Sequence, residues 1–234
     1  MRDKLFTRLL SVEGRDALKL VVHPSPHADA IIINLPGYKS ELDGYNGKYR
    51  KIGAMLSEKK IGACIQMPNN LHTYHRNESL FLEDLRAVIT YAKRETWEMC
   101  WKPSARIYLA GVSAGAIAVS TVASEYEEVE KILLVAPSLT SRSDHNDLIK
   151  RGIGDFKGEV SITVGETDMV TGILAAHNYY EFALRAKVRR FVPIPSCDHQ
   201  FSGTRNGQIL CNAYLWAFAG EGNFPSPDGG LELY

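Results

Sequence analysis

Short apolar runs alternate along the chain with stretches in which apolar residues recur at helical spacing. Continuous apolar runs are typical of buried strands, and they lie at 30–35, 61–67, 106–110, 131–136, 159–165 and 189–194. Helical patterns fill the intervals at 46–60, 78–96, 114–124, 172–187 and 203–219, and the apolar face is clearest in 78–96. This alternation predicts a mostly parallel sheet with helices on both faces.

The remaining segments frame this pattern. Two further apolar stretches, 5–14 and 17–23, flank a polar turn and predict an antiparallel hairpin before the sheet core. Residues 138–158 read as an irregular connector that is too short for a multi-helix lid, so we expect no large cap. Within it, the glycines of 152–158 indicate a flexible connector. Residues 221–234 contain two prolines and three glycines, and predict a loosely held tail on a single domain that spans 1–234.

Composition narrows the class of protein. Of the 234 residues, 27 are Lys or Arg and 27 are Asp or Glu, so there is no basic excess of the kind that nucleic-acid binding requires. No apolar run reaches the roughly 20 residues that span a membrane, and the first residues lack the features of a signal peptide. The four cysteines are scattered, which favours reduced thiols in a cytoplasmic protein. We expect no nucleic-acid or membrane partner and no cofactor; nothing in the sequence indicates an oligomeric state.

The motif with the most chemical content is Gly111-Val112-Ser113-Ala114-Gly115, a G-x-S-x-G pattern between a predicted strand and a helix of small residues. A turn this tight places Ser113 in a strained backbone conformation, and a side chain at either glycine would collide with neighbouring elements. The serine hydroxyl then stands above the sheet at a helix start. The pattern predicts a nucleophile at Ser113, whereas the alternative is a Gly-rich turn with no chemistry.

A serine nucleophile needs a base to take its proton and an acid to orient that base. His199 is the histidine that follows the last predicted strand, where this base is expected. The loop after 159–165 offers Glu166 and Asp168 as the acid, and we favour Asp168 because it stands further out, just before the next helix. Asp198 adjoins the base and is interpreted as a residue that shapes the loop.

Acyl transfer also needs N–H donors for the developing oxyanion. The backbone N–H of Ala114 is one candidate. The loop after 30–35 contains Pro36-Gly37-Tyr38, in which the glycine allows close approach and the Tyr38 N–H is the second candidate. The alternative is that Pro36-Gly37 forms an ordinary turn.

Together these stretches resemble the α/β-hydrolase superfamily from about residue 5 to 219, and most closely its small serine esterases and its dienelactone-hydrolase-like or prolyl-oligopeptidase-like domains. The G-x-x-D stretch at 165–168 and the D-H-x-F stretch at 198–201 match patterns that recur there. The resemblance implies the α/β-hydrolase fold, with about eight strands, mostly parallel, and the second strand antiparallel. Pro36 stands where many members have His, and Ser113 stands where dienelactone hydrolases proper have Cys, which argues against lactone-specific chemistry.

The loop at 68–77 follows a strand end, so its residues are either substrate-lining or simply solvated: Leu71, His72, Tyr74, His75 and Arg76. His72 and His75 have no carboxylate cluster nearby, so we expect no metal site. The leading hypothesis is hydrolysis of a small-molecule carboxylic ester through an acyl-enzyme. Amide or peptide hydrolysis and acyl transfer would use the same residues, and a non-catalytic binding protein could retain the fold.

Overall fold

The computed structural model of the protein describes residues 4–73, 77–140 and 143–233. Within these residues the strands form one eight-stranded sheet in the order β1-β2-β4-β3-β5-β6-β7-β8. The strands are β1 (Phe6–Leu10), β2 (Leu18–His23), β3 (Ala30–Leu35), β4 (Ala63–Gln66), β5 (Arg106–Val112), β6 (Val129–Val135), β7 (Glu159–Gly165) and β8 (Val188–Ile194).

The sheet is antiparallel at one end and parallel over the rest. β2 runs antiparallel to both of its neighbours, β1 and β4, whereas β4, β3, β5, β6, β7 and β8 pair in parallel. Ile31, Ile32 and Ile33 in the middle of β3 have no solvent exposure, because helices cover both faces of a parallel sheet. The mostly parallel sheet, its antiparallel second strand and the amino-terminal hairpin are thereby confirmed.

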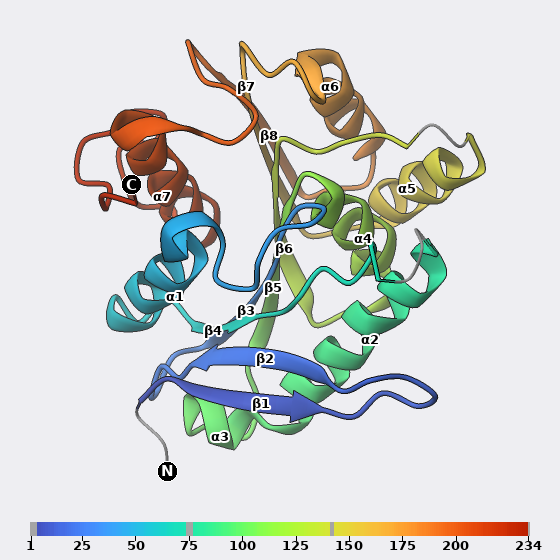
Figure 1. Ribbon diagram of the computed structural model, residues 1–234, viewed down its shortest axis with the longest axis vertical. Coiled ribbons are helices and arrows are strands. Elements are labelled where there is room, and N and C mark those ends of the chain that lie inside the picture. Colours follow the sequence, from blue (N-terminus) through green and yellow to red (C-terminus); the bar gives the residue numbers. More distant parts are fainter. Residues whose placement is uncertain (1–3, 74–76, 141–142, 234) are drawn as a thin grey trace.

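The helices lie in two layers (Figure 1). The helices α1 (Lys48–Glu58) and α7 (Gly203–Ala219) cover one face of the sheet, with the short η1 turn (Tyr45–Gly47) preceding α1. The other face is covered by α2 (Glu78–Arg94), α4 (Ala114–Val122), α5 (Ser143–Asp155) and α6 (Gly172–Phe182). Two shorter elements, α3 (Thr96–Cys100) and η2 (Ala123–Glu125), follow α2 and α4.

One expected connector is in fact a helix. Residues 138–158 were expected to be irregular, but α5 occupies Ser143–Asp155 and buries Ile149, Gly152 and Ile153. A Cβ on Gly152 would lie 2.4 Å from the Ser120 backbone oxygen, so this glycine lets α5 pack closely on α4. The glycines at 152 and 154 therefore do not form a flexible connector, and the prediction for this segment is corrected.

The carboxyl-terminal segment also differs from the loosely held tail that its composition suggested. The Asn212 side chain of α7 donates hydrogen bonds to the Ser226 and Asp228 carbonyls, at 2.8 and 3.0 Å. Phe224 stacks on Trp216 of α7, with ring centroids 4.6 Å apart. These side-chain hydrogen bonds satisfy turn carbonyls that have no partner in regular structure, and they tie the segment to α7.

Two sequence expectations concern the whole chain. None of the helices in the described residues is long and apolar enough to cross a bilayer. Cys64, Cys100, Cys197 and Cys211 are described, buried and not joined in disulfides.

Candidate active site

Three side chains from three different loops converge at the carboxyl-terminal edge of the sheet. Ser113 follows β5 directly, Asp168 follows β7, and His199 lies in the loop after β8. Because parallel strands all end at this edge, residues far apart in the sequence meet there.

The turn that carries Ser113 has the backbone that its motif predicts. Ser113 has φ 52° and ψ −116°, a conformation that non-glycine residues rarely adopt and that costs free energy to hold. A Cβ on Gly111 would lie 2.6 Å from Ala116 Cα, and a Cβ on Gly115 would lie 2.2 Å from the Leu35 oxygen. The predicted collisions at both glycines are confirmed, and the strand, the helix and the β3 loop can approach only because both positions lack side chains.

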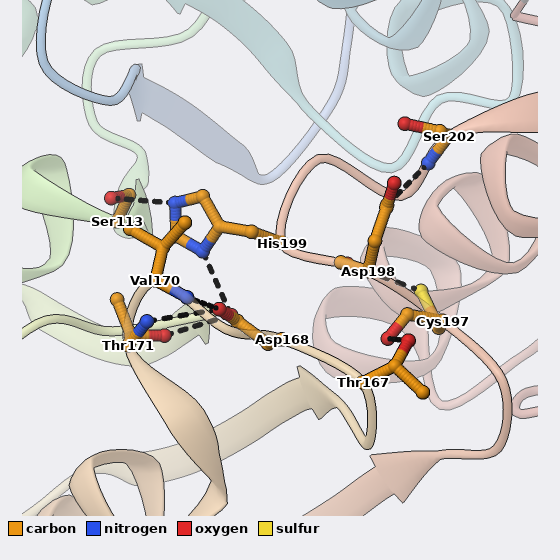
Figure 2. A network of polar contacts seen from close by, with 9 residues as sticks. All are labelled: Ser113, Thr167, Asp168, Val170, Thr171, Cys197, Asp198, His199 and Ser202. Atoms are coloured by element: carbon orange, nitrogen blue, oxygen red, sulfur yellow. Dashed lines mark hydrogen bonds and ion pairs between the residues drawn. The ribbon is translucent and has the colours of Figure 1, made fainter.

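The His199 ring lies between the serine and the carboxylate (Figure 2). Its Nε2 is 3.0 Å from Ser113 Oγ, and its Nδ1 is 2.7 Å from Asp168 Oδ2. An ionised carboxylate only accepts hydrogen bonds, so Nδ1 carries a proton and donates a hydrogen bond to Asp168. In the neutral ring Nε2 is then free to accept a hydrogen bond from the Ser113 hydroxyl.

The Asp168 carboxylate accepts several hydrogen bonds besides the one from His199. Its Oδ1 accepts hydrogen bonds from the backbone N–H groups of Val170 and Thr171 at 2.8 and 2.9 Å, and its Oδ2 accepts one from the Thr171 hydroxyl at 2.8 Å. Burial raises the pKa of Asp168, but these bonds and the one from His199 outweigh burial and hold the pKa below its ordinary value. The carboxylate is therefore charged and oriented near neutral pH.

The other nearby acids and the nearby thiol take different places. Glu166 is exposed, whereas Asp168 is only 5% exposed. Asp198 accepts a hydrogen bond from the Ser202 N–H at 2.8 Å, next to the start of α7, and so shapes the loop as expected. Burial raises the pKa of the Cys197 thiol to about 12, which keeps it protonated and a poor nucleophile.

The loop after β3 lies directly against the serine. A Cβ on Gly37 would be 3.3 Å from Ser113 Cβ, which places the backbone that leads into Tyr38 beside the Ser113 side chain. Ala114 begins α4, so its N–H is among those at the amino end of this helix. The buried Asn69 donates to the Pro36 carbonyl at 2.9 Å, and thus steadies this loop from the loop after β4.

A cavity of about 720 Å³ opens beside Ser113 and His199. Its walls come from the β3 loop, from the start of α1 and from the loops after β5, β7 and β8. Besides Ser113 and His199, its lining includes Gly37, Tyr38, Lys39, Ser40, Glu41, Tyr45, Asn46, Lys48, Tyr49, Val112, Val170 and Gln200.

The residues of 68–77 that were predicted to line the substrate entrance do not form one group in the structure. Leu71 is buried in the hydrophobic core and is not part of the cavity wall. His72 is exposed and lies edge-on to the Tyr38 ring, with centroids 6.5 Å apart. Tyr74, His75 and Arg76 lie outside the described residues. Among the residues that the structure does describe, no group of three or more His, Cys, Asp or Glu side chains could hold a metal ion.

Several residues of the site are not among those that the sequence motifs predict. Thr171 and Asn69 act through hydrogen bonds to Asp168 and Pro36, and Lys48 and Tyr49 reach the cavity from the start of α1. A polar residue two or three positions after a catalytic acid is the one local signal that could have pointed to Thr171.

Comparison with known proteins places the fold. No family model and no curated protein matches the chain. Among solved structures, a dienelactone hydrolase from Anabaena variabilis has a TM-score of 0.76 at 18% identity, and the match covers 93% of this chain and 97% of that one. Est1E from Butyrivibrio proteoclasticus has a TM-score of 0.68 at 16% identity, and the match covers 88% of this chain and 95% of that one. The esterase domain of a Rhodothermus marinus protein has a TM-score of 0.69 at 17% identity, covering 89% and 95%. The chain has the α/β-hydrolase fold.

Proposed function

We propose that the protein is a serine hydrolase of carboxylic esters that works through an acyl-enzyme intermediate. The observation that carries the proposal is the His199 ring, which is hydrogen-bonded through Nε2 to Ser113 and through Nδ1 to Asp168. A nucleophile, a base and an orienting acid in contact are the parts that acyl transfer by serine requires.

The two half-reactions follow from this geometry. Ser113 Oγ attacks the ester carbonyl carbon while His199 Nε2 takes the hydroxyl proton. The tetrahedral intermediate then collapses, and the C–O bond to the alcohol breaks as Nε2 returns the proton to the departing oxygen. Water next attacks the acyl carbon while His199 Nε2 takes a proton from the water. The bond between the acyl carbon and Ser113 Oγ then breaks as Nε2 returns the proton to Oγ, and the acid product leaves. Asp168 stays charged throughout and stabilises the imidazolium that forms twice in the cycle.

The carbonyl oxygen becomes negative in both tetrahedral intermediates. We assign the backbone N–H groups of Tyr38 and Ala114 to this oxygen, because Gly37 brings the β3 loop against Ser113 and Ala114 opens α4. A helix start favours negative charge, and donors that are already in place cost no reorganisation during the reaction.

Ester hydrolysis is favoured over the other uses of this chemistry by the solved structures of like fold, which include one named as an esterase domain and one named as a dienelactone hydrolase. Amide hydrolysis and acyl transfer to another acceptor need the same three side chains. A cavity of about 720 Å³ is of a size that holds a small molecule, so we propose a small-molecule ester as the substrate.

Labelling with a fluorophosphonate probe and turnover of a graded series of p-nitrophenyl esters test the proposal. Wild type should react with the probe and hydrolyse at least part of the series, and Ser113→Ala should do neither. Loss of a triad member costs on the order of 10⁴- to 10⁶-fold in rate.

Ser120→Ala is the matched control, because Ser120 lies in the same helix and does not line the cavity. Its buried hydroxyl has no hydrogen-bond partner within the described residues, so its removal should leave activity and folding intact. Probe labelling or esterase turnover in Ser113→Ala within tenfold of wild type, in a preparation free of host esterases, would contradict the proposal.

A further inference from the structure

Lys48 is a buried lysine in the wall of the cavity that contains Ser113 and His199. It is the first residue of α1 and only 8% exposed. Lysine is rarely buried to this degree unless its ammonium is paired with an acid, because removal of the charge from water is costly.

No such pairing exists for Lys48 among the described residues, where neither a hydrogen bond nor an ion pair to its ammonium is found. The ammonium lies over the Tyr49 ring, 5.3 Å from the centroid, and this contact stabilises a cation without neutralising it. Burial lowers the pKa of Lys48, and the Asp198 carboxylate offsets this in part. Asp198 is itself hydrogen-bonded to the Ser202 N–H.

The surroundings of Lys48 add to the positive potential. α1 begins here without a side-chain cap, and the Tyr49 backbone N–H donates to the Asp43 carbonyl at 2.9 Å. The amino end of the helix still carries partial positive charge beside the lysine. Lys39 also lines the cavity, and the acidic residue in its lining is the exposed Glu41. The cavity wall around Lys48 therefore carries more positive than negative charge, and an anion would balance it.

We infer that Lys48 binds an anionic group of the substrate, so that the preferred substrates are esters that carry a second, negatively charged group such as a carboxylate away from the scissile bond. The inference deepens and rests on the proposed ester hydrolysis. A carboxylate in the cavity would supply the counter-ion that the protein does not provide, and would hold the ester carbonyl in a fixed direction relative to Ser113.

The test compares p-nitrophenyl half-esters of succinic, glutaric and adipic acid with their neutral methyl esters, because the three lengths sample the distance between the serine and the lysine. Wild type should prefer the anionic member at one length or more, by about tenfold or more in kcat/KM. Lys48→Met keeps the aliphatic stem without the charge, and should lower this preference by about tenfold or more.

Lys59→Met is the matched control, since it makes the same change at the exposed other end of the same helix and should leave the preference unchanged. Thermal unfolding shows whether the variants fold. If Lys48→Met does not fold, Lys48→Gln takes its place in the comparison. A wild type with no preference at any length, or a preference that Lys48→Met retains, would overturn the inference.

A binding measurement separates this inference from the proposed function. Ser113→Ala is titrated by calorimetry with monomethyl glutarate and with neutral dimethyl glutarate, alone and combined with Lys48→Met. Tighter binding of the anion that disappears with Lys48→Met supports the anion site even if wild type hydrolyses no ester. Equal binding of the two ligands would overturn the site while leaving the hydrolase assignment intact.

Discussion

Two carboxylates stand in the loop after β7, and they lie in opposite environments. Asp168 is buried and contacts His199, whereas Glu166 is exposed. We expect Asp168→Asn to lose activity by on the order of 10⁴-fold, because an amide can present its N–H to Nδ1 and so favour the wrong tautomer. Glu166→Gln, the matched control, should change kcat/KM by less than about tenfold. Steady-state kinetics on a p-nitrophenyl ester measure both, and the reverse ranking in folded variants would assign the acid to Glu166.

Gly37 allows a second comparison at the scale of single residues. A methyl group at this position would press on Ser113 Cβ at 3.3 Å, and would point toward Oγ at 3.9 Å. Since small displacements of a nucleophile are costly, Gly37→Ala should lower kcat/KM by about tenfold to a hundredfold. Chemical denaturation should show that the free energy of unfolding changes less than the kinetics do, because the nearest atom that the methyl group would contact belongs to the Ser113 side chain in the cavity wall. Unchanged kinetics would mean that this loop does not approach the reacting atoms.

The residues that sequence alone could find are those whose chemistry is written in local patterns. Ser113 lies in G-x-S-x-G, and Asp168 and His199 follow strands that the apolar runs predict, so the sequence could name all three as candidates. The structure brings their side chains into contact. Asn69 contacts the β3 loop and Lys48 lines the cavity from segments distant in the sequence, and their residue types alone do not distinguish them from surface residues. Leu71 shows the opposite kind of error. It was predicted to line the substrate entrance, but this apolar residue of a polar loop packs into the hydrophobic core.

At the scale of elements, the approach of α4 to β3 depends on one missing side chain. A Cβ on Gly115 would lie 2.2 Å from the Leu35 oxygen and 2.8 Å from the Pro36 oxygen, both of them backbone atoms. Gly115→Ala should therefore shift the helix or the strand and destabilise the fold by about 3 kcal/mol, at the upper end of overpacking effects. Urea unfolding measures the loss.

Gly154→Ala in α5 is the control for this prediction. Its Cβ would meet the Phe182 oxygen at 3.3 Å, a tight but tolerable contact, and alanine favours a helix over glycine. The stability of this variant should stay within about 1 kcal/mol of wild type. A Gly115→Ala variant as stable as Gly154→Ala would show that α4 and β3 are not held at van der Waals distance.

Strands could be predicted more fully than helices, for a physical reason. The parallel strands are buried on both faces, so each appears as an unbroken apolar run, and β3 was predicted with its observed bounds. α5 buries a narrow stripe of Ile149, Gly152 and Ile153, two apolar side chains and a glycine. A glycine that serves close helix packing has the same appearance in the sequence as one that breaks a helix.

At the scale of the whole molecule, the candidate active site lies at one edge of the sheet, whereas the hydrophobic core lies between the sheet and its two layers of helices. The loops after β5, β7 and β8 carry Ser113, Asp168 and His199, the proposed nucleophile, acid and base, and the amino end of α1 lines the cavity beside Ser113 and His199. The tail packs back on α7 and reaches α1, where Lys51 donates to the Leu233 carbonyl at 3.3 Å. The layer formed by α1 and α7 is thus joined by the same segment that composition alone marked as loose.

The stability of this layered structure should depend on pH through a histidine outside the active site. His23, in β2, is buried, and its Nε2 has no hydrogen-bond partner in the part of the chain that the structure describes. Its pKa is lowered from 6.5 to about 4, chiefly by burial and also by the positive charge of Arg50, while Asp43 acts in the opposite direction. Between these two pH values the unfolded chain binds a proton at His23 and the folded protein does not. Stability is therefore full above pH 6.5 and falls as the pH drops toward 4.

The loss from this one group should reach about 3 kcal/mol at pH 4, because each unit of pKa difference corresponds to about 1.4 kcal/mol. Urea unfolding of wild type and His23→Gln from pH 7.5 to 4 measures it as the difference between the two curves, so that the carboxylates common to both cancel. His23→Gln should be less stable than wild type at pH 7, because a differently shaped polar side chain replaces the ring. The difference in free energy of unfolding between the two proteins should become smaller, or change sign, as the pH falls toward 4. His177→Gln on the exposed face of α6 is the matched control and should run parallel to wild type. A constant gap between wild type and His23→Gln across this range would show that His23 does not resist protonation in the folded protein.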